Sequence, residues 1–370
     1  MARDLRWDPC VAHRGSEVDG FIAEYFALSG RRTVLIAGAG FDPRSTAVAT
    51  RLALTGAPMR AIFIRENRPN PTQDLIDRAE ENTGALLSTI TDRELVPVDI
   101  FGTDGAVTGG RNVITLLGRQ NFDGITDVVI DISALSVGTS FPIIRYFVER
   151  VERRRGPPNI HVFVAHDPKL DADIRSIPSD APGHVHGFKG GSTLDGSAAA
   201  AKLWLPQLVS GRRSALGRLY DFVAPHDTCP ILPFPASNPR LGDALAEEYI
   251  IELESTWAVD TRNIVYADES DPLDLYRTIL RLDDRRKPVF AGAGGSLLVL
   301  SPLGSKVMAL GALMAALERD LPVAHLEPIG YTLEAIQGGV VAPSLVHIWL
   351  EGDVYPAPRP ALHAEGGPRG

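Results

Sequence analysis

Short apolar runs alternate with amphipathic segments through the first 165 residues of the chain. The runs at 33–37 and 126–132 are continuously apolar and rich in β-branched residues, which is typical of strands buried on both faces. Similar runs predict strands at 61–65, 95–99 and 160–165, and helical spacing predicts helices at 45–55, 73–87, 112–120 and 139–154. This alternation predicts a parallel sheet wound by helices.

The pattern breaks between residues 166 and 245, where prolines and glycines recur and only the segment 196–220 resembles a helix. We interpret this region as a connection with loops that cover a site. The tail 356–370 is expected to be disordered. The predicted fold class is α/β, with two Rossmann-like halves (1–165 and 246–355) whose mostly parallel sheets are wound by helices. Elements of the second half are expected at 248–254, 263–267, 273–282, 288–291, 297–301, 306–318, 323–327 and 347–351.

Composition and charge narrow the class of protein and its partners. Of 370 residues, 44% are hydrophobic and 22% are charged, and the formal net charge is −9. A negative chain gives no strong nucleic-acid signal. Cys10 and Cys229 are the only cysteines, which fits a reducing compartment. The start lacks a signal-peptide core and the longest apolar run (307–317) is too short to span a bilayer, so we expect a cytoplasmic protein with no membrane partner.

The first candidate site is the corner after the strand at 33–37, with the sequence Gly38-Ala-Gly40-Phe-Asp42-Pro43-Arg44-Ser45. A helix start offers free amides and the positive end of the dipole, so it attracts anions. Arg44 runs against that dipole, which a bound anion would explain. The two glycines begin like a dinucleotide fingerprint, but Pro43 replaces the third glycine. Glu66, after the next strand, is a candidate for ribose hydroxyls. The alternative is a plain turn with Pro43 at the favoured first helical position.

A comparable corner lies in the second half, with the sequence Ser301-Pro-Leu-Gly304-Ser305-Lys306. Here Lys306 is a candidate phosphate contact, with Ser305 and backbone amides beneath the ligand. The corner is not a P-loop, because Val299 stands where that motif needs a glycine. The alternative is an ordinary capped helix whose lysine points to solvent.

A hydroxyl-rich loop follows the strand at 126–132 and contains Asp131, Ser133 and Ser136. Carboxyl ends of parallel strands are where open α/β sheets bind ligands. Asp131 is a candidate to hold a ribose, to position a water or to cap the loop. The alternative is that these hydroxyls only cap the next helix.

No catalytic set emerges from the sequence, so the catalytic residues stay unknown. There is no G-x-S-x-G elbow for a serine hydrolase. His184 and His186 have a spacing that a metal could use, but they lie in the proline-broken segment and no cysteine pair supports them. We therefore expect no metal site, and we favour ligand binding over catalysis.

The two corners and the strand end together resemble the Rossmann-like sensor domains of prokaryotic defence systems, namely CRISPR-associated Rossmann-fold domains and the related SAVED domains. The resemblance rests on short motifs, and Ser305 replaces the more usual threonine. It implies a nucleotide-like ligand, a cyclic oligonucleotide in particular, and a role as sensor or regulatory subunit in antiviral defence. A protein partner would supply the effector activity. The ligand contacts that it implies are Arg44, Ser45, Ser133, Gly304, Ser305 and Lys306.

Two other interpretations stay open. The loop from Gly38 to Arg44 also resembles the Gly-x-Gly-x-Asp-Thr-Arg loop of carboxyl methyltransferases, which implies S-adenosylmethionine as cofactor and Glu66 as the ribose ligand. Pro43 replaces the threonine of that loop, and the corner at Lys306 is left unexplained. A non-catalytic structural subunit of a larger assembly is the third interpretation.

Overall fold

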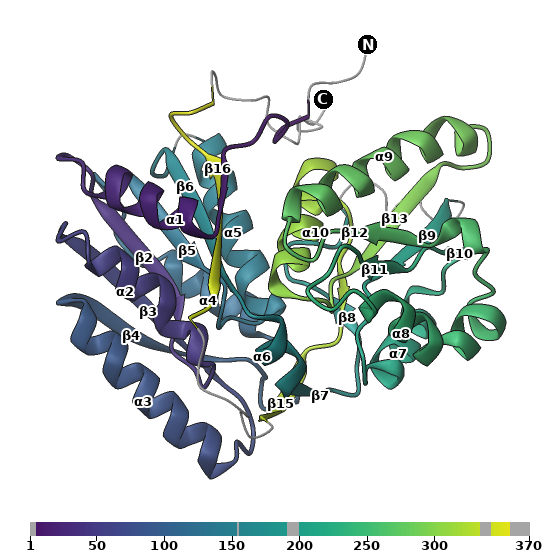
Figure 1. The fold of residues 1–370 in the computed structure, drawn as a ribbon, viewed down its shortest axis with the longest axis horizontal. Helices are drawn as coiled ribbons and strands as arrows, with labels where there is room; N and C mark the ends of the chain where they lie inside the picture. Colours follow the sequence, from purple (N-terminus) through teal and green to yellow (C-terminus); the bar gives the residue numbers. More distant parts are fainter. Residues whose placement is uncertain (1–4, 154, 191–199, 334–341, 356–370) are drawn as a thin grey trace, which may run out of the picture.

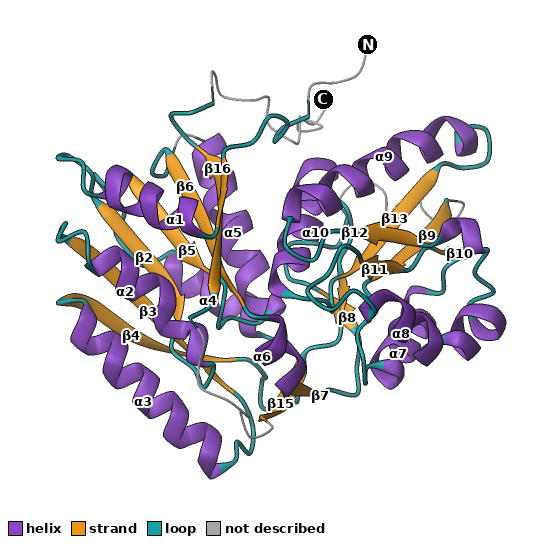
Figure 2. Cartoon of the chain, viewed as in Figure 1, coloured by secondary structure: helices purple, strands orange, loops and turns teal. Residues whose placement is uncertain are grey.

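Two α/β units lie side by side in the computed structural model, which describes residues 5–153, 155–190, 200–333 and 342–355 (Figure 1). In both units helices pack on sheets whose strands run mostly parallel, as the colouring by secondary structure shows (Figure 2). The predicted α/β class with mostly parallel sheets is thereby confirmed. None of the helices in the described part of the chain is long and apolar enough to cross a membrane.

The first unit is built on a seven-stranded sheet. Its strands are β1 (Ala12–Arg14), β2 (Thr33–Gly38), β3 (Met59–Asn67), β4 (Asp92–Asp99), β5 (Asp127–Asp131), β6 (Asn159–His166) and β16 (Ser344–Glu351). They lie in the order β1-β16-β6-β5-β2-β3-β4, with β2 to β6 parallel and β16 antiparallel to β6. The order reverses between β2 and β5, and such a switch point opens a crevice at the carboxyl ends of the strands.

Alternate side chains of these strands pack against helices on opposite faces of the sheet. Leu35 and Phe63 contact one helical layer, whereas Ile36 and Ile62 contact the other. The first layer contains α1 (Ser16–Phe21), α2 (Ala47–Ala53) and α3 (Gln73–Thr89), and the second contains α4 (Gly109–Leu117) and α5 (Val137–Glu152). Because the helices after β2 and β5 lie on opposite faces, the loops that start them face the same crevice.

The second unit has a smaller sheet in the order β10-β9-β13, with parallel neighbours. A parallel pair, β11 with β12, lies beside it through the bridge between Gln207 and Ile231. Its strands are β9 (Ala201–Pro206), β10 (Asp227–Thr228), β11 (Ile231–Pro233), β12 (Val265–Ala267) and β13 (Ser296–Ser301). Its helices are α7 (Arg213–Val223), α8 (Leu241–Glu248), α9 (Pro272–Phe290) and α10 (Lys306–Arg319).

Helix α10 joins the two units into one core. Every residue from Val307 to Leu317 is buried, and α10 contacts α5 and β6 of the first unit as well as α9. A helix that is apolar on all sides is stable in water only when other elements surround it. The apolar run at 307–317 is therefore explained by its position between the two sheets.

The connections between the units differ from the sequence-based expectation. The chain leaves through α6 (Pro168–Asp173), β7 (Ile174–Pro178) and β8 (Gly183–His184), and returns through β14 (Ala324–His325) and β15 (Pro328–Leu333). The strands β7 and β15 pair as an antiparallel ribbon between the units (Figure 1).

Three expected elements have a different structure. The segment interpreted as a helix at 196–220 contains β9, the middle strand of the second sheet, so the second half reaches into the expected connection at 166–245. Residues 288–291 continue α9 or follow it rather than forming a separate element. The strand at 347–351, expected in the second half, belongs to β16 of the first sheet. The expected disordered tail at 356–370 lies outside the described residues.

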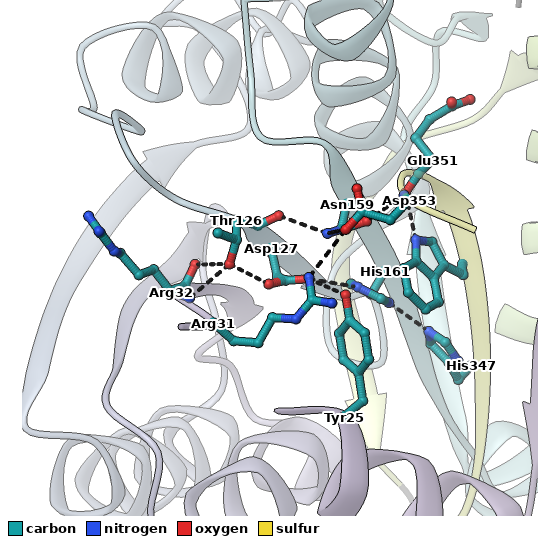
Figure 3. Close-up of polar contacts among 11 residues, drawn as sticks. Tyr25, Arg31, Arg32, Thr126, Asp127, Asn159, His161, His347, Glu351 and Asp353 are labelled. Carbon is teal, nitrogen blue, oxygen red and sulfur yellow. Dashed lines mark hydrogen bonds and ion pairs between the residues drawn. The ribbon is translucent and has the colours of Figure 1, made fainter. Parts of the chain in front are cut away.

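A chain of polar side chains links β1, β16, β6 and β5, and Figure 3 shows its part around Asp127, His161 and His347. His161 of β6 and His347 of β16 are fully buried, and Nδ1 of His161 lies 3.0 Å from Nε2 of His347. Nδ1 of His347 lies 2.9 Å from Nδ1 of His13 on β1, and Nε2 of His161 lies 3.3 Å from the carboxylate of Asp127. Tyr25 also donates to Asp127, at 2.7 Å.

The ionised carboxylate of Asp127 fixes the proton positions along this chain, because it can only accept hydrogen bonds. His161 therefore carries its proton on Nε2 and accepts on Nδ1 from His347, which in turn accepts from His13. All three imidazoles are neutral in this arrangement. Burial lowers the pKa of His161, of His347 and of His13, which favours the same neutral state.

Acid is expected to destabilise the protein through these histidines. Below the ordinary imidazole pKa of 6.5, the unfolded chain binds protons at these histidines that the folded chain does not bind. The stability contribution of the neutral histidines is therefore fully present above pH 6.5 and is lost as the pH falls below it. Each of the two fully buried histidines, His161 and His347, contributes a slope of up to about 1.4 kcal/mol per pH unit. Denaturant unfolding of wild type and His161→Gln between about pH 5 and 7 measures it. Equal slopes in the two proteins would contradict this account.

Candidate functional site

A cavity of about 650 Å³ lies where the carboxyl ends of both sheets meet. The first unit contributes the loops after β2, β3 and β5, and the second contributes the turn before α10. The ribbon of β7 and β15 and the start of α7 complete the lining. The crevice predicted by the strand order therefore forms one side of this cavity. A cavity of this size suits a small organic ligand.

At the first corner, Arg44 is held by two carboxylates of the protein itself. Its guanidinium donates to both oxygens of Asp42, at 3.0 and 2.8 Å, and to Asp171 of α6 at 2.6 Å. Burial alone would lower the pKa of Arg44, but these two acids outweigh it and raise the pKa. Asp42 also accepts from the Arg44 amide and so caps the short 3₁₀ helix Pro43–Thr46. A cation at this helix start thus has partners without any ligand.

The strand end at β5 is a structural turn beneath the cavity. Asp131 accepts from the amide of Ser133 at 2.9 Å and from its hydroxyl, and this hydroxyl accepts from the Ala165 amide at 2.7 Å. The second carboxylate oxygen of Asp131 is buried and has no hydrogen-bond partner among the described residues. Burial, assisted by the nearby Asp42, raises the pKa of Asp131 to about 7, although Ser133 and Arg44 oppose the change.

Glu66 lies at the start of α5 rather than free in the cavity. One of its oxygens accepts from the Ser136 amide at 2.9 Å, and the other accepts from Arg68 at 2.8 Å. Arg68 also donates to Glu327 at 2.6 Å. A carboxylate is favourable at a helix N-terminus. Each oxygen of Glu66 accepts one hydrogen bond from the protein, so a ribose hydroxyl would share these oxygens with Ser136 and Arg68.

The second corner places Lys306 inside the cavity, at the first residue of α10. Its ammonium donates to the backbone oxygen of Leu135, in the loop after β5, and it forms no ion pair with any residue of the described chain. Burial lowers the pKa of Lys306; the nearby Arg44 acts in the same direction, whereas Glu66 opposes it. Ser305 caps α10 by accepting from the Met308 amide at 3.3 Å.

Arg212 is a second cation of the cavity, and no sequence pattern points to it. It precedes α7 and donates to the backbone oxygen of Ser176 at 2.6 Å and to the Ser176 hydroxyl. Within the described ranges it has no carboxylate partner, and burial lowers its pKa. Nearby, the ring of Tyr331 lies 5.2 Å from that of Phe41, and Arg68 lies over the Tyr331 ring. Both rings border the cavity and form an apolar part of its wall.

The charges lining the cavity oppose the charge of the whole chain. Five cationic and three acidic side chains line it, whereas the chain carries a formal charge of −9. The acids are Asp42, Glu66 and Asp171, and the cations are Arg44, Arg65, Arg68, Arg212 and Lys306. The lining therefore carries an excess of two positive charges, and such an excess in a concave site with low-dielectric walls concentrates anionic ligands.

Most of the residues selected from the sequence meet at this one cavity. Those that line it are Gly40, Asp42, Arg44, Glu66, Ser133, Ser136, Gly304, Ser305 and Lys306. Gly38, Ser45 and Asp131 are outside the lining. Gly38 has a packing role, because a Cβ there would lie 2.7 Å from the backbone oxygen of Ala134. No group of three or more metal-ligating side chains occurs in the part of the chain that the structure describes.

Comparisons with known proteins identify no family. No protein-family model and no curated protein matches the chain. Among solved structures, a universal stress protein from Archaeoglobus fulgidus DSM 4304 has a TM-score of 0.24 at 8% identity, over 80% of this chain and 96% of that one. The RhlG/NADP active-site complex of Pseudomonas aeruginosa has a TM-score of 0.21 at 13% identity, over 80% of this chain and 92% of that one. Similarities of this size carry no functional argument.

Proposed function

We propose that the cavity between the two units binds a nucleotide-like anion and that the protein acts as a ligand sensor or regulatory subunit. One observation carries the proposal: Lys306 and Arg212 enter the cavity and contact backbone oxygens instead of carboxylates. Removing a cation from water is costly without a counter-charge, and an anionic ligand would supply one. Phe41 and Tyr331 provide an apolar part of the wall for a base.

The resemblance to CRISPR-associated Rossmann-fold and SAVED domains narrows this proposal to a cyclic oligonucleotide and a role in prokaryotic defence. In that role a protein partner carries the effector activity. Binding rather than catalysis is proposed because two of the polar residues of the lining, Arg44 and Ser133, are held in structural contacts.

The test is a binding panel with a matched pair of variants. Cyclic oligonucleotides, nucleoside monophosphates, nicotinamide dinucleotides and S-adenosylmethionine are compared by thermal shift and calorimetry. We expect Lys306→Met to weaken binding of the anionic ligand by about tenfold or more, because the counter-charge is lost. Lys169→Met, at an exposed lysine of α6, is the control and should bind like wild type.

Three outcomes would contradict the proposal. Equal affinity in Lys306→Met and Lys169→Met would show that Lys306 does not contact the ligand. Binding of S-adenosylmethionine alone would favour a methyltransferase. Binding of none of the compounds would favour a structural subunit of an assembly.

A further inference from the structure

A second cavity adjoins the first at the carboxyl ends of β3 and β4. Its volume is about 840 Å³, and it extends between the starts of α4 and α5 and the segment 179–189. The two cavities share wall residues, which are Asn67, Arg68, Pro69, His325 and Ile329. The two cavities therefore lie next to each other, and a ligand that reaches across these shared residues would occupy both cavities.

Basic side chains gather at the second cavity. Arg111 lies in the first turn of α4, where the helix dipole opposes a cation. His186 packs directly on this turn, since a Cβ on Gly110 would lie 2.8 Å from the His186 Cβ. Burial lowers the pKa of His186, and Arg111, Lys189 and Arg145 lower it further. Three cationic side chains therefore lie near His186.

Two acids of the second cavity form ion pairs, whereas two of its cations form none with the residues that the structure describes. Asp180 pairs with Arg218 at 3.2 Å, Asp99 accepts from Asn67 at 2.9 Å, and Glu327 accepts from Arg68 at 2.6 Å. Neither Arg111 nor Lys189 forms an ion pair within the described ranges of the chain. Because the partner of Asp99 is a neutral amide, the unpaired charges of this lining, counted over the described residues, are two cations, Arg111 and Lys189, and one acid, Asp99, so positive charge is in excess by one.

We propose that the second cavity binds a second phosphate group of the same ligand, through Arg111, Lys189 and His186. The ligand is then elongated and carries two separated phosphates, one near Lys306 and one near Arg111, with Arg68 in the wall between them. A dinucleotide has this chemistry, and a nucleoside monophosphate has only half of it. This inference rests on the proposed nucleotide binding in the first cavity.

The experiment compares the four nucleoside monophosphates with cyclic dinucleotides and with 5′-phosphorylated linear dinucleotides by calorimetry on the full chain. We expect dinucleotides to bind at least about tenfold more tightly than monophosphates, because the second phosphate adds a site. The double variant Arg111→Gln/Lys189→Gln should remove this gain and leave the affinity for monophosphates unchanged. Arg119→Gln, an exposed arginine just after the same helix, is the control and should keep the gain.

The possible failures are distinguishable. If monophosphates bind with sensitivity to Lys306→Met but dinucleotides bind no more tightly, the second subsite is wrong and the first stands. If the gain persists in the double variant, the second phosphate binds elsewhere. If neither class of compound binds, nucleotide binding itself is wrong and the inference falls with it.

Discussion

Arg44→Met is expected to lower the free energy of unfolding by about 3 kcal/mol or more, because removing one member of a buried ion pair leaves its partner charged and unpaired. Arg44 is only 4% exposed, and its loss would leave both Asp42 and Asp171 without their cation. Denaturant unfolding at neutral pH measures the change.

The double variant Arg44→Met/Asp42→Asn is the control for this prediction. It removes the more buried of the two orphaned acids, so it should be more stable than Arg44→Met alone. If Arg44 were held only by a ligand, Arg44→Met would unfold like wild type and the double variant would show no recovery.

Asp131→Asn is expected to stabilise the protein in mildly alkaline solution. The pKa of Asp131 is raised from the ordinary 3.8 to about 7 in the folded state. The folded protein therefore has the full stability contribution of this carboxyl below pH 3.8 and loses it as the pH rises from 3.8 to about 7. Between about pH 5 and 8 the advantage of the asparagine variant should grow by about 3 kcal/mol. Asparagine has no charge to desolvate, and its oxygen can still accept from the Ser133 amide.

Unfolding midpoints of wild type and Asp131→Asn across this pH range test the prediction. Asp123→Asn, at an exposed turn, is the control and should follow wild type. A constant difference between Asp131→Asn and wild type at all pH values would show that the carboxyl of Asp131 does not titrate in this range.

The strands and the two glycine corners could be predicted because their causes are local. Buried parallel strands need continuous apolar runs, and a helix start needs a cap, as Asp42 and Ser305 provide. The order of the strands then brings the loops after β2 and β5 to one edge of the sheet. That Lys306 meets the same cavity agrees with the expectation that the two corners form one site, while its contact with a ligand stays a prediction.

The remaining contacts depend on distant segments, which no local pattern reveals. Arg44 pairs with Asp171 across 127 positions, so the cation that suggested a ligand has a partner that the sequence hides. Arg212 is not predicted as a site residue, because the segment that contains it is predicted as part of one helix. The apolar run of β9 is short, and the pattern therefore does not separate it from α7. The alternation of strands and helices also does not show which sheet a strand joins. The strand at 347–351 is therefore predicted in the second half, whereas it is part of β16, which pairs with β6 of the first sheet.

The pairing of β6 with β16 has a topological consequence. His166, the last residue of β6, lies opposite Ser344, the first residue of β16, in the antiparallel ladder. The whole second unit thus takes the place of a hairpin loop, entering and leaving the first sheet at adjacent points. Insertions of domains are tolerated at such positions, because the two ends of the host strand pair are already close together. The first unit is then the host domain and the second unit is the inserted domain. Helix α10 of the inserted domain packs against α5 and β6 of the host domain, so the two domains share one core.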